Sequence, residues 1–190
     1  MFLEQLRNNT ASLHKALEQT PISVKLLSAN VTAEDYALYL EKLYGFLVVF
    51  DELIFPKVQH LFPGTHSKSH LIEADLIALG RNIDNKKEIS KESISYQFET
   101  VEDAIGGLYV LEGSTLGGMV IHKHLFDKLG EHISGSTNYL TVYGNQTGST
   151  WKAFIDRLNE AALQYNQEDI IGGAKKTFAI LHDWMTEKIA

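Results

Sequence analysis

One histidine near the start of the chain has neighbours that suit it to bind a ligand. His14 lies beside the apolar stripe of an expected N-terminal helix, and Arg7 and Glu18 share its stripe because offsets of four and seven residues return to one helix face. Glu18 can accept a hydrogen bond from one ring nitrogen of His14, which fixes the tautomer and leaves the other nitrogen for a ligand. The same spacing also fits a surface histidine paired with a glutamate, so this cluster alone does not decide between the two.

The other histidines form weaker patterns. His60, His66 and His70 flank an expected loop and could bind a metal, but no HExxH or ExxH spacing accompanies them. The absence of ExxH also argues against a carboxylate-bridged di-iron bundle. We expect the remaining four to be structural or surface residues: His122, His124, His132 and His182.

Five glycines lie within thirteen residues of an otherwise apolar helical stretch: Gly106, Gly107, Gly113, Gly117 and Gly118. Each glycine inside a helix costs roughly 1 kcal/mol relative to alanine, so the five together cost about 5 kcal/mol. That cost approaches the whole stability of a marginal domain, roughly 5 kcal/mol. We therefore expect something large and flat to lie against this backbone. A Gly-x-x-x-Gly pair also lets two helices pack closely, which would explain two of the glycines but not five.

Composition excludes several classes of function. The 190 residues carry a net charge of −7 and show no basic face, so we expect no nucleic-acid partner. The lack of cysteine excludes disulfides, zinc–thiolate sites, Fe–S clusters and a cysteine nucleophile. Apolar runs fall far short of about 18 residues and the N-terminus does not resemble a signal peptide, so we expect a cytoplasmic protein without a membrane span. No GxGxxG, P-loop or GxSxG motif supports nucleotide binding or serine hydrolysis.

Helical periodicity dominates the chain, and strand-like alternation is nearly absent. This pattern predicts an all-α protein in which residues 1–190 form a single domain. Thr32 with Asp35, and Thr100 with Asp103, are typical of capping boxes that open helices. The first expected helix ends before Pro21, the second runs from Thr32 to Phe55 with Pro56 as a kink, and a short third covers residues 70–80. A glycine-rich helix then runs from Thr100 to Leu129. A further helix is capped by Ser149 or Thr150 and reaches Leu163, and the last runs from Gln167 to the end. Leu61–Ser69 and the polar residues 81–96 are expected to be irregular, and residues 134–148 to form turns.

Three segments, in this order and separation, resemble the haem oxygenases, in particular the small bacterial enzymes. Leu6-Arg-Asn-Asn-Thr-Ala-Ser-Leu-His-Lys-Ala-Leu-Glu18 is similar to their proximal helix, and Glu112-Gly-Ser-Thr-Leu-Gly-Gly118 is similar to their distal helix. Ala174–Trp184 is similar to the closing helix of the bacterial members. The likeness covers nearly the whole chain, and it implies the all-α helical bundle of that family.

The resemblance also implies a set of site residues. His14 would bind the iron of haem (iron protoporphyrin IX), Glu18 would contact this histidine, and Arg7 would meet a haem propionate. Gly113 and Gly117 stand where the distal helix bends over the haem, so that their backbone groups, with Ser114, would carry catalysis. Further candidate haem contacts are Gly118, Lys175, Lys176 and Phe178.

The implied activity is oxidative opening of haem, with O2, to biliverdin or an isomer, with release of carbon monoxide and ferrous iron. Haem would be both cofactor and substrate. Electrons would come from a ferredoxin or a flavoprotein reductase, because no motif for flavin or nicotinamide binding is present. Ser114 stands where the animal enzymes carry an aspartate. Several bacterial relatives also lack this acid and rely on backbone groups and ordered water.

Two other functions compete with this one. A haem carrier or sensor on the same scaffold would bind haem without degrading it. A related all-α domain could instead bind another ligand or only pack its helices. The thiamin-degrading proteins share the fold, but their chemistry uses a cysteine, which this chain lacks.

Overall fold

A computed structural model describes residues 2–84 and 88–187, and within these ranges it contains helices and no β-strand. The prediction of an all-α protein is therefore confirmed. The α-helices are α1 (Phe2–Glu18), α2 (Pro21–Leu26), α3 (Ala33–Val58), α4 (Ser69–Ala78), α5 (Lys91–Ile94), α6 (Val101–Leu129), α7 (Thr147–Ala161) and α8 (Gln167–Thr186). Short 3-10 turns are η1 (Ser95–Gln97), η2 (Gly130–Ile133) and η3 (Gly144–Gln146).

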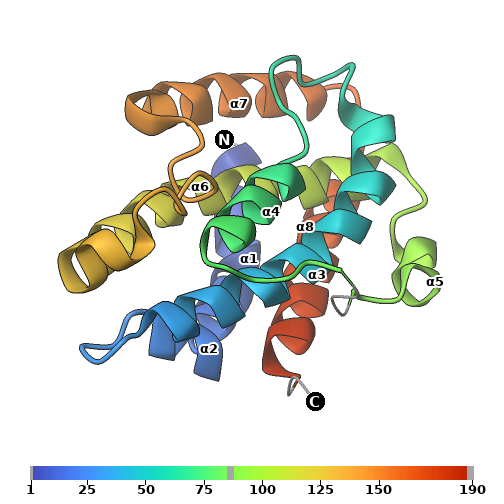
Figure 1. Cartoon of the computed structure of the whole chain (residues 1–190). Helices are drawn as coiled ribbons and strands as arrows, with labels where there is room; N and C mark the ends of the chain where they lie inside the picture. The colour runs from blue at the N-terminus through green and yellow to red at the C-terminus, as the bar shows by residue number, and fades with distance from the viewer. Residues whose placement is uncertain (1, 85–87, 188–190) are drawn as a thin grey trace.

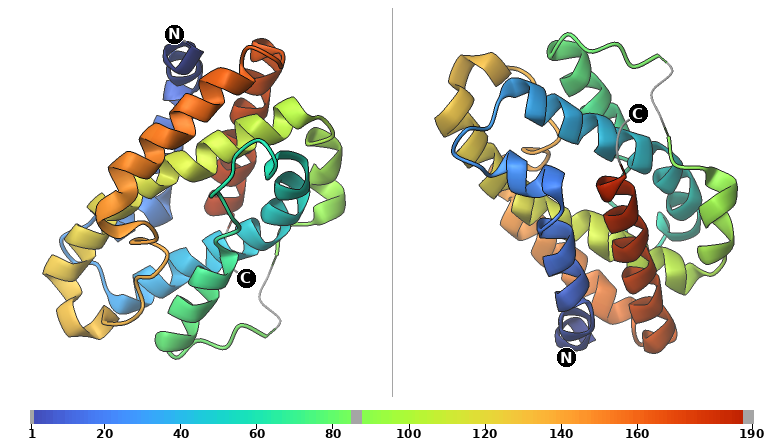
Figure 2. Two further views of the ribbon diagram at one scale, coloured as in Figure 1. Left: turned by 90° about the horizontal axis from the view of Figure 1, so that it is seen from above. Right: turned by 90° about the horizontal axis from the view of Figure 1, so that it is seen from below.

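The glycine-rich helix α6 runs through the middle of the molecule. Figure 1 shows α7 above it and α8 below it, and the right-hand view in Figure 2, from below, shows α1 and α8 side by side. Helices α6, α8, α1 and α3 form the main packing layers. Phe46, Phe50 and Phe98 pack ring against ring in the core between α3 and α6, with neighbouring centroids 4.8 Å apart.

Both predicted capping boxes are confirmed. The side chain of Thr32 accepts from the amide of Asp35 at 3.1 Å, and the Asp35 carboxylate accepts from the Thr32 amide at 2.8 Å. Thr100 and Asp103 make the same exchange at 3.1 and 3.2 Å. These bonds satisfy amides that have no partner inside the helix, which fixes where α3 and α6 begin.

The end of the first helix before Pro21 is confirmed, since α1 ends at Glu18. Helix boundaries differ from the prediction elsewhere. A short helix, α2, was not predicted: Pro21 opens it at its first turn, where a missing N–H costs nothing, and Thr20 caps it. Pro56 lies within α3, which continues to Val58. The next difference concerns α7, which begins at Thr147 rather than after a Ser149 or Thr150 cap, because the turn η3 leads directly into it.

Two other expectations concern the less regular segments. Residues 81–96 were expected to be irregular, but α5 and η1 form short helical turns from Lys91 to Gln97; residues 85–87 lie outside the described part of the chain. Helix α8 ends at Thr186, and its expected continuation over residues 188–190 also lies outside the described residues.

One helical stretch, Val101–Ile133, has the length and composition of a membrane-crossing helix, which the short apolar runs of the sequence did not suggest. In this structure 61% of its most apolar window is buried inside the fold. A central helix of a globular bundle has this character because it packs against neighbours on most of its surface. Its hydrophobicity is therefore explained by its place in the core.

Candidate functional site

Helix α6 meets the N-terminal part of the chain at two points, one on α1 and one after α2. At one end Tyr109 of α6 lies beside Thr10 and Arg7 of α1. At the other end the Nε2 atom of His124 lies 3.1 Å from the carbonyl of Ser28, which follows α2. The fifteen residues from position 109 to position 124 span about 22 Å of helix. In the sequence, His14 lies between Thr10 and Ser28, and the central glycines of α6 lie between Tyr109 and His124.

His14 presents its ring outside the packed core. Its Nδ1 atom lies 3.5 Å from Glu18 Oε1, and the His14 side chain is 59% exposed. Phe178 of α8 meets the ring edge-on, with centroids 5.7 Å apart. Glu18 and Phe178 together orient the imidazole, and Nε2 is then the nitrogen that is available to a ligand. The predicted pairing of His14 with Glu18 is confirmed.

One stripe of α6 faces this region, because residues at offsets of four, seven, eight and eleven from Tyr109 share its face. Gly117 lies on the stripe, and a Cβ atom added there would meet nothing within 4 Å. Leu116 and Val120, beside it, are 38% and 67% exposed. Gly113 is half-buried, and a Cβ there would lie 3.6 Å from the ring of Trp151. The stripe therefore offers an apolar, side-chain-poor wall of the kind that a flat apolar ligand requires.

At the other three positions, neighbouring protein atoms leave no room for a side chain. A Cβ on Gly106 would lie 2.2 Å from the carbonyl oxygen of Ile170, and one on Gly107 would lie 2.8 Å from the Phe50 ring. A Cβ on Gly118 would lie 3.0 Å from the carbonyl oxygen of Leu140. The expectation that a ligand explains all five glycines is therefore wrong: helix and loop packing accounts for these three.

The predicted basic residues fall into two groups. Arg7 is exposed beside Tyr109, and Lys175 donates to Asn9 of α1 at 3.2 Å, so both lie on the α1 side of the molecule. Lys176 instead donates to Asp103 at 2.6 Å and to the carbonyl of Gln97, at the beginning of α6. The structure therefore gives Lys176 a role in joining α8 to α6, away from the candidate site.

Ser114 lies next to the stripe and is exposed. Its hydroxyl donates to the carbonyl of Leu111 at 2.7 Å and lies 3.5 Å from the hydroxyl of Tyr139. Burial, with the nearby charges of Asp51 and Glu112 as smaller contributions, raises the pKa of Tyr139, so this phenol remains a hydrogen-bond donor. Sequence reasoning missed Tyr139, since the contact joins segments 25 residues apart.

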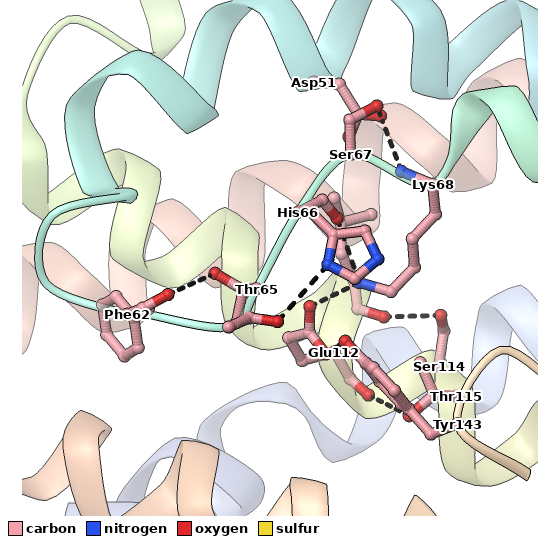
Figure 3. Close-up of polar contacts among 12 residues, drawn as sticks. Asp51, Phe62, Thr65, His66, Ser67, Lys68, Glu112, Ser114, Thr115 and Tyr143 are labelled. Carbon is pink, nitrogen blue, oxygen red and sulfur yellow. Dashed lines mark hydrogen bonds and ion pairs between the residues drawn. The ribbon is translucent and has the colours of Figure 1, made fainter.

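Sequence reasoning also missed a buried polar cluster on the adjoining face of α6 (Figure 3). Lys68 Nζ contacts Glu112 Oε1, and the two residues are only 4% and 2% exposed. Tyr143 donates to Glu112 Oε2 at 3.0 Å. Glu112 was detectable as an isolated acid within a buried helix, but Lys68 and Tyr143 lie in loops whose sequences give no such signal.

The loop histidines do not form a metal centre with other ligands. The rings of His66 and His70 are 6.5 Å apart, and within residues 2–84 and 88–187 no group of three or more His, Cys, Asp or Glu side chains could hold a metal ion. His124 contacts Ser28 as described, and His122 stacks on Phe126 at 5.9 Å. These histidines serve packing or lie at the surface.

The structure is thus an all-α protein with an exposed imidazole on α1 and an open, glycine-bearing face on α6. The family model described as Heme oxygenase matches residues 1–187, and the chain belongs to this family. The family binds haem as both cofactor and substrate, so the chain is an enzyme of haem degradation. Comparison with curated proteins gave no match.

Two solved structures share the fold. The heme oxygenase of Neisseria meningitidis, in its NO- and CO-bound crystal structures, is 24% identical over 97% of this chain and 90% of its own, with a TM-score of 0.76. The heme oxygenase of Leptospira interrogans is 17% identical over 97% of this chain and 98% of its own, with a TM-score of 0.73. At these identities the likeness supports the architecture, and residue roles must be argued from this chain.

The residues present fit haem. A planar ligand requires a wall without side chains, which Gly117 provides with open space in front of its Cα. Haem iron requires a ligand from the protein, and His14 can offer a ring nitrogen, with its Nδ1 already turned to Glu18. Carboxylates at the edge of the ligand require cations, and Arg7 and Lys175 lie on the same side of the molecule.

Proposed function

We propose that the chain opens haem to biliverdin or an isomer, carbon monoxide and ferrous iron, using O2 and external electrons, with haem held between His14 and the wall formed by Gly113 and Gly117. Haem supplies the redox chemistry when bound and is itself the molecule oxidised. The observation that carries this proposal is an exposed imidazole on α1 beside Glu18, together with the open face of Gly117 on α6, in a chain of the heme oxygenase family.

His14 acts as the iron ligand in this proposal. The contact of Nδ1 with Glu18 leaves Nε2 for the iron, and Phe178 restricts rotation of the ring. An imidazole suits the reaction better than a thiolate, which would favour O–O cleavage. Arg7 and Lys175 would pair with the propionates.

On the opposite side, Gly113 and Gly117 let the helix backbone come close to the ligand, because neither carries a side chain. Ser114 would hold water beside this backbone: its oxygen can accept a hydrogen bond while its own proton is donated to Leu111. The Tyr139 hydroxyl, 3.5 Å away, is the side-chain donor next to it. We leave Gly118 and Lys176 out of the haem site, since they contact Leu140 and Asp103 respectively.

Several finer features belong to the same proposal. Electrons would come from a ferredoxin or flavoprotein reductase, because no motif in the sequence binds a flavin or nicotinamide. We also propose a cytoplasmic location and a single domain over residues 1–190. The bacterial neighbours and the burial of α6 within the fold support a protein that is not held in a membrane.

A haem titration followed by turnover tests this proposal. The purified protein should give the Soret band of a histidine-ligated haem, and ascorbate or a reductase system should bleach that band and yield a bilin spectrum. A Soret band without bilin would favour a carrier or sensor. Failure to bind haem would contradict both functions.

A further inference from the structure

Three polar side chains meet inside the protein on the face of α6 that adjoins Gly113 (Figure 3). Lys68 comes from the segment between α3 and α4, Glu112 from α6, and Tyr143 from the turn before α7. The Lys68 ammonium contacts one oxygen of the Glu112 carboxylate, and Tyr143 donates to the other at 3.0 Å. The ammonium also lies 5.4 Å from the centre of the Tyr143 ring. We call these residues the Glu112 cluster.

Burying the Glu112 cluster in the core costs free energy of desolvation. Lys68 and Glu112 are both more than nine-tenths buried, so both lose nearly all their hydration. Hydrophobic residues of similar size would pack there without that loss, and buried ion pairs are often no better for stability than such replacements. What an ion pair with a third hydrogen-bonding partner does supply is a defined geometry, because each oxygen of the Glu112 carboxylate is held by its own partner, Lys68 or Tyr143.

The segment that follows Glu112 needs an external support. Gly113, Gly117 and Gly118 lie within six residues, and glycine restricts the backbone least of all residues. The hydroxyls of Ser114 and Thr115 each donate to a carbonyl three residues earlier at 2.7 Å, which competes with regular helical bonding. A contact made by a side chain immediately before Gly113 is therefore well placed to hold this backbone.

Both loops that supply the cluster are themselves held by buried carboxylates. Asp51 of α3 accepts from the hydroxyl of Ser67 and from the amide of Lys68 at 3.3 Å. Asp75 of α4, fully buried, accepts from the amide of Asn138 at 2.8 Å and from the amide of Tyr139 at 2.9 Å. The cluster thus connects the glycine segment to α3 and α4 through two fixed loops.

We propose that Lys68, Glu112 and Tyr143 are positioning residues for haem degradation: they hold the backbone from Gly113 to Gly118 at one place opposite His14. This role rests on the proposed function, because it concerns the wall that haem would contact. None of the three residues touches the reacting atoms. They restrict the positions that the glycine backbone can take, and this restriction raises kcat.

A double substitution separates positioning from stability. Lys68→Met together with Glu112→Leu removes both charges of the ion pair at once and fills a similar volume, so neither member is left buried alone. Asp51 keeps its bonds from the Ser67 hydroxyl and the backbone amide at position 68. We expect the variant to melt close to the unsubstituted protein. Without haem, amide hydrogen exchange over residues 113–118 should rise at least about tenfold above the unsubstituted protein, because local opening no longer has to break the cluster.

In the haem-loaded protein the same double variant should lose kcat at least about tenfold, while its affinity for haem changes by less than about threefold. Tyr143→Phe keeps the ring and removes only the hydroxyl, so it should shift exchange and kcat in the same direction by a smaller factor. The matched control is Glu52→Gln with Lys91→Gln, an exposed pair 2.8 Å apart that joins α3 to the short helix α5. This control should change neither quantity.

The outcomes distinguish the two proposals. Faster exchange over residues 113–118 together with a lower kcat supports the positioning role. Unchanged exchange, or an unchanged kcat, in a double variant that folds normally overturns it. If Lys68→Met/Glu112→Leu fails to fold, Tyr143→Phe decides by the same two measurements. Absence of bilin from the unsubstituted protein would instead overturn the proposed function, and this role with it.

Discussion

The two ends of the glycine pattern on α6 serve opposite purposes. Around Gly106 the helix lies so close to α8 that a Cβ would come within 2.2 Å of backbone atoms, and Gly173 faces it with equally little room. Around Gly117 there is open space. The same residue type is thus required at one place because another helix is present, and at the other because the protein leaves room for a ligand. Substitution by alanine distinguishes the two cases.

The largest effect is expected at the packed end. Gly106→Ala places a methyl group against the backbone of Ile170 and Ala174, which cannot move aside without separating α6 from α8. We expect the free energy of unfolding to fall by about 3 kcal/mol, in spite of alanine's better helix propensity. Chemical denaturation measures this, and a loss below about 1 kcal/mol would show that the helices are not packed this closely.

At the open end a large side chain should affect function rather than folding. Gly117→Leu adds a side chain where nothing lies within 4 Å, so the haem-free protein should be at least as stable as the unsubstituted one. Turnover of haem should fall at least about tenfold, equivalent to about 1.4 kcal/mol, because the leucine occupies the ligand's place. Normal turnover by a folded Gly117→Leu protein would remove Gly117 from the site.

The packed end also has its own pH dependence. Burial would raise the pKa of Asp103, but hydrogen bonds from Lys176 and Thr100 outweigh it and lower that pKa below the usual 3.8. A carboxyl with a lowered folded-state pKa stabilises the protein above its unfolded pKa, and this contribution is lost as pH falls. Asp103→Asn should therefore cost about 1 kcal/mol at pH 7.

Denaturation curves recorded from pH 7 down to pH 3 measure this contribution directly. The difference between Asp103→Asn and the unsubstituted protein should shrink as the pH approaches 3.8 and falls below it. A difference that stays constant over this range would show that the ion pair with Lys176 does not stabilise the packed end.

The smallest expected effect is an increase in the free energy of unfolding. Gly117→Ala should stabilise the haem-free protein by roughly 0.5–1 kcal/mol, since alanine is the better helix former and its methyl group meets no neighbour. Paired with Gly106→Ala, it gives two identical substitutions on one helix with opposite consequences. A destabilisation at Gly117 would show that this backbone is not open.

Local signals in the sequence predicted most of the helices correctly. Thr32 with Asp35, and Thr100 with Asp103, are short-range patterns whose partners lie three residues away, so the sequence was enough to predict where α3 and α6 begin. The end of α1 before Pro21 was predicted, but α2 was missed, because a proline that follows one helix can also open the next, as the Thr20 cap shows here.

The site was predicted unevenly for the same reason. The pairing of His14 with Glu18 is local and was predicted. The separate roles of Gly106 and Gly117 depend on what lies opposite them, and Glu112 finds its partner Lys68 at a distance of 44 residues. Contacts of that kind exist only once the helices have packed.

The most direct test of the account is the absorption spectrum of the His14→Ala protein with haem, recorded with and without added imidazole. The account predicts that the substitution removes the Soret band of histidine-ligated haem and abolishes bilin formation, and that imidazole, which fills the space left by the side chain, restores the band. A His14→Ala protein that shows the unsubstituted spectrum and degrades haem at the unsubstituted rate without imidazole would contradict the placement of haem between α1 and α6.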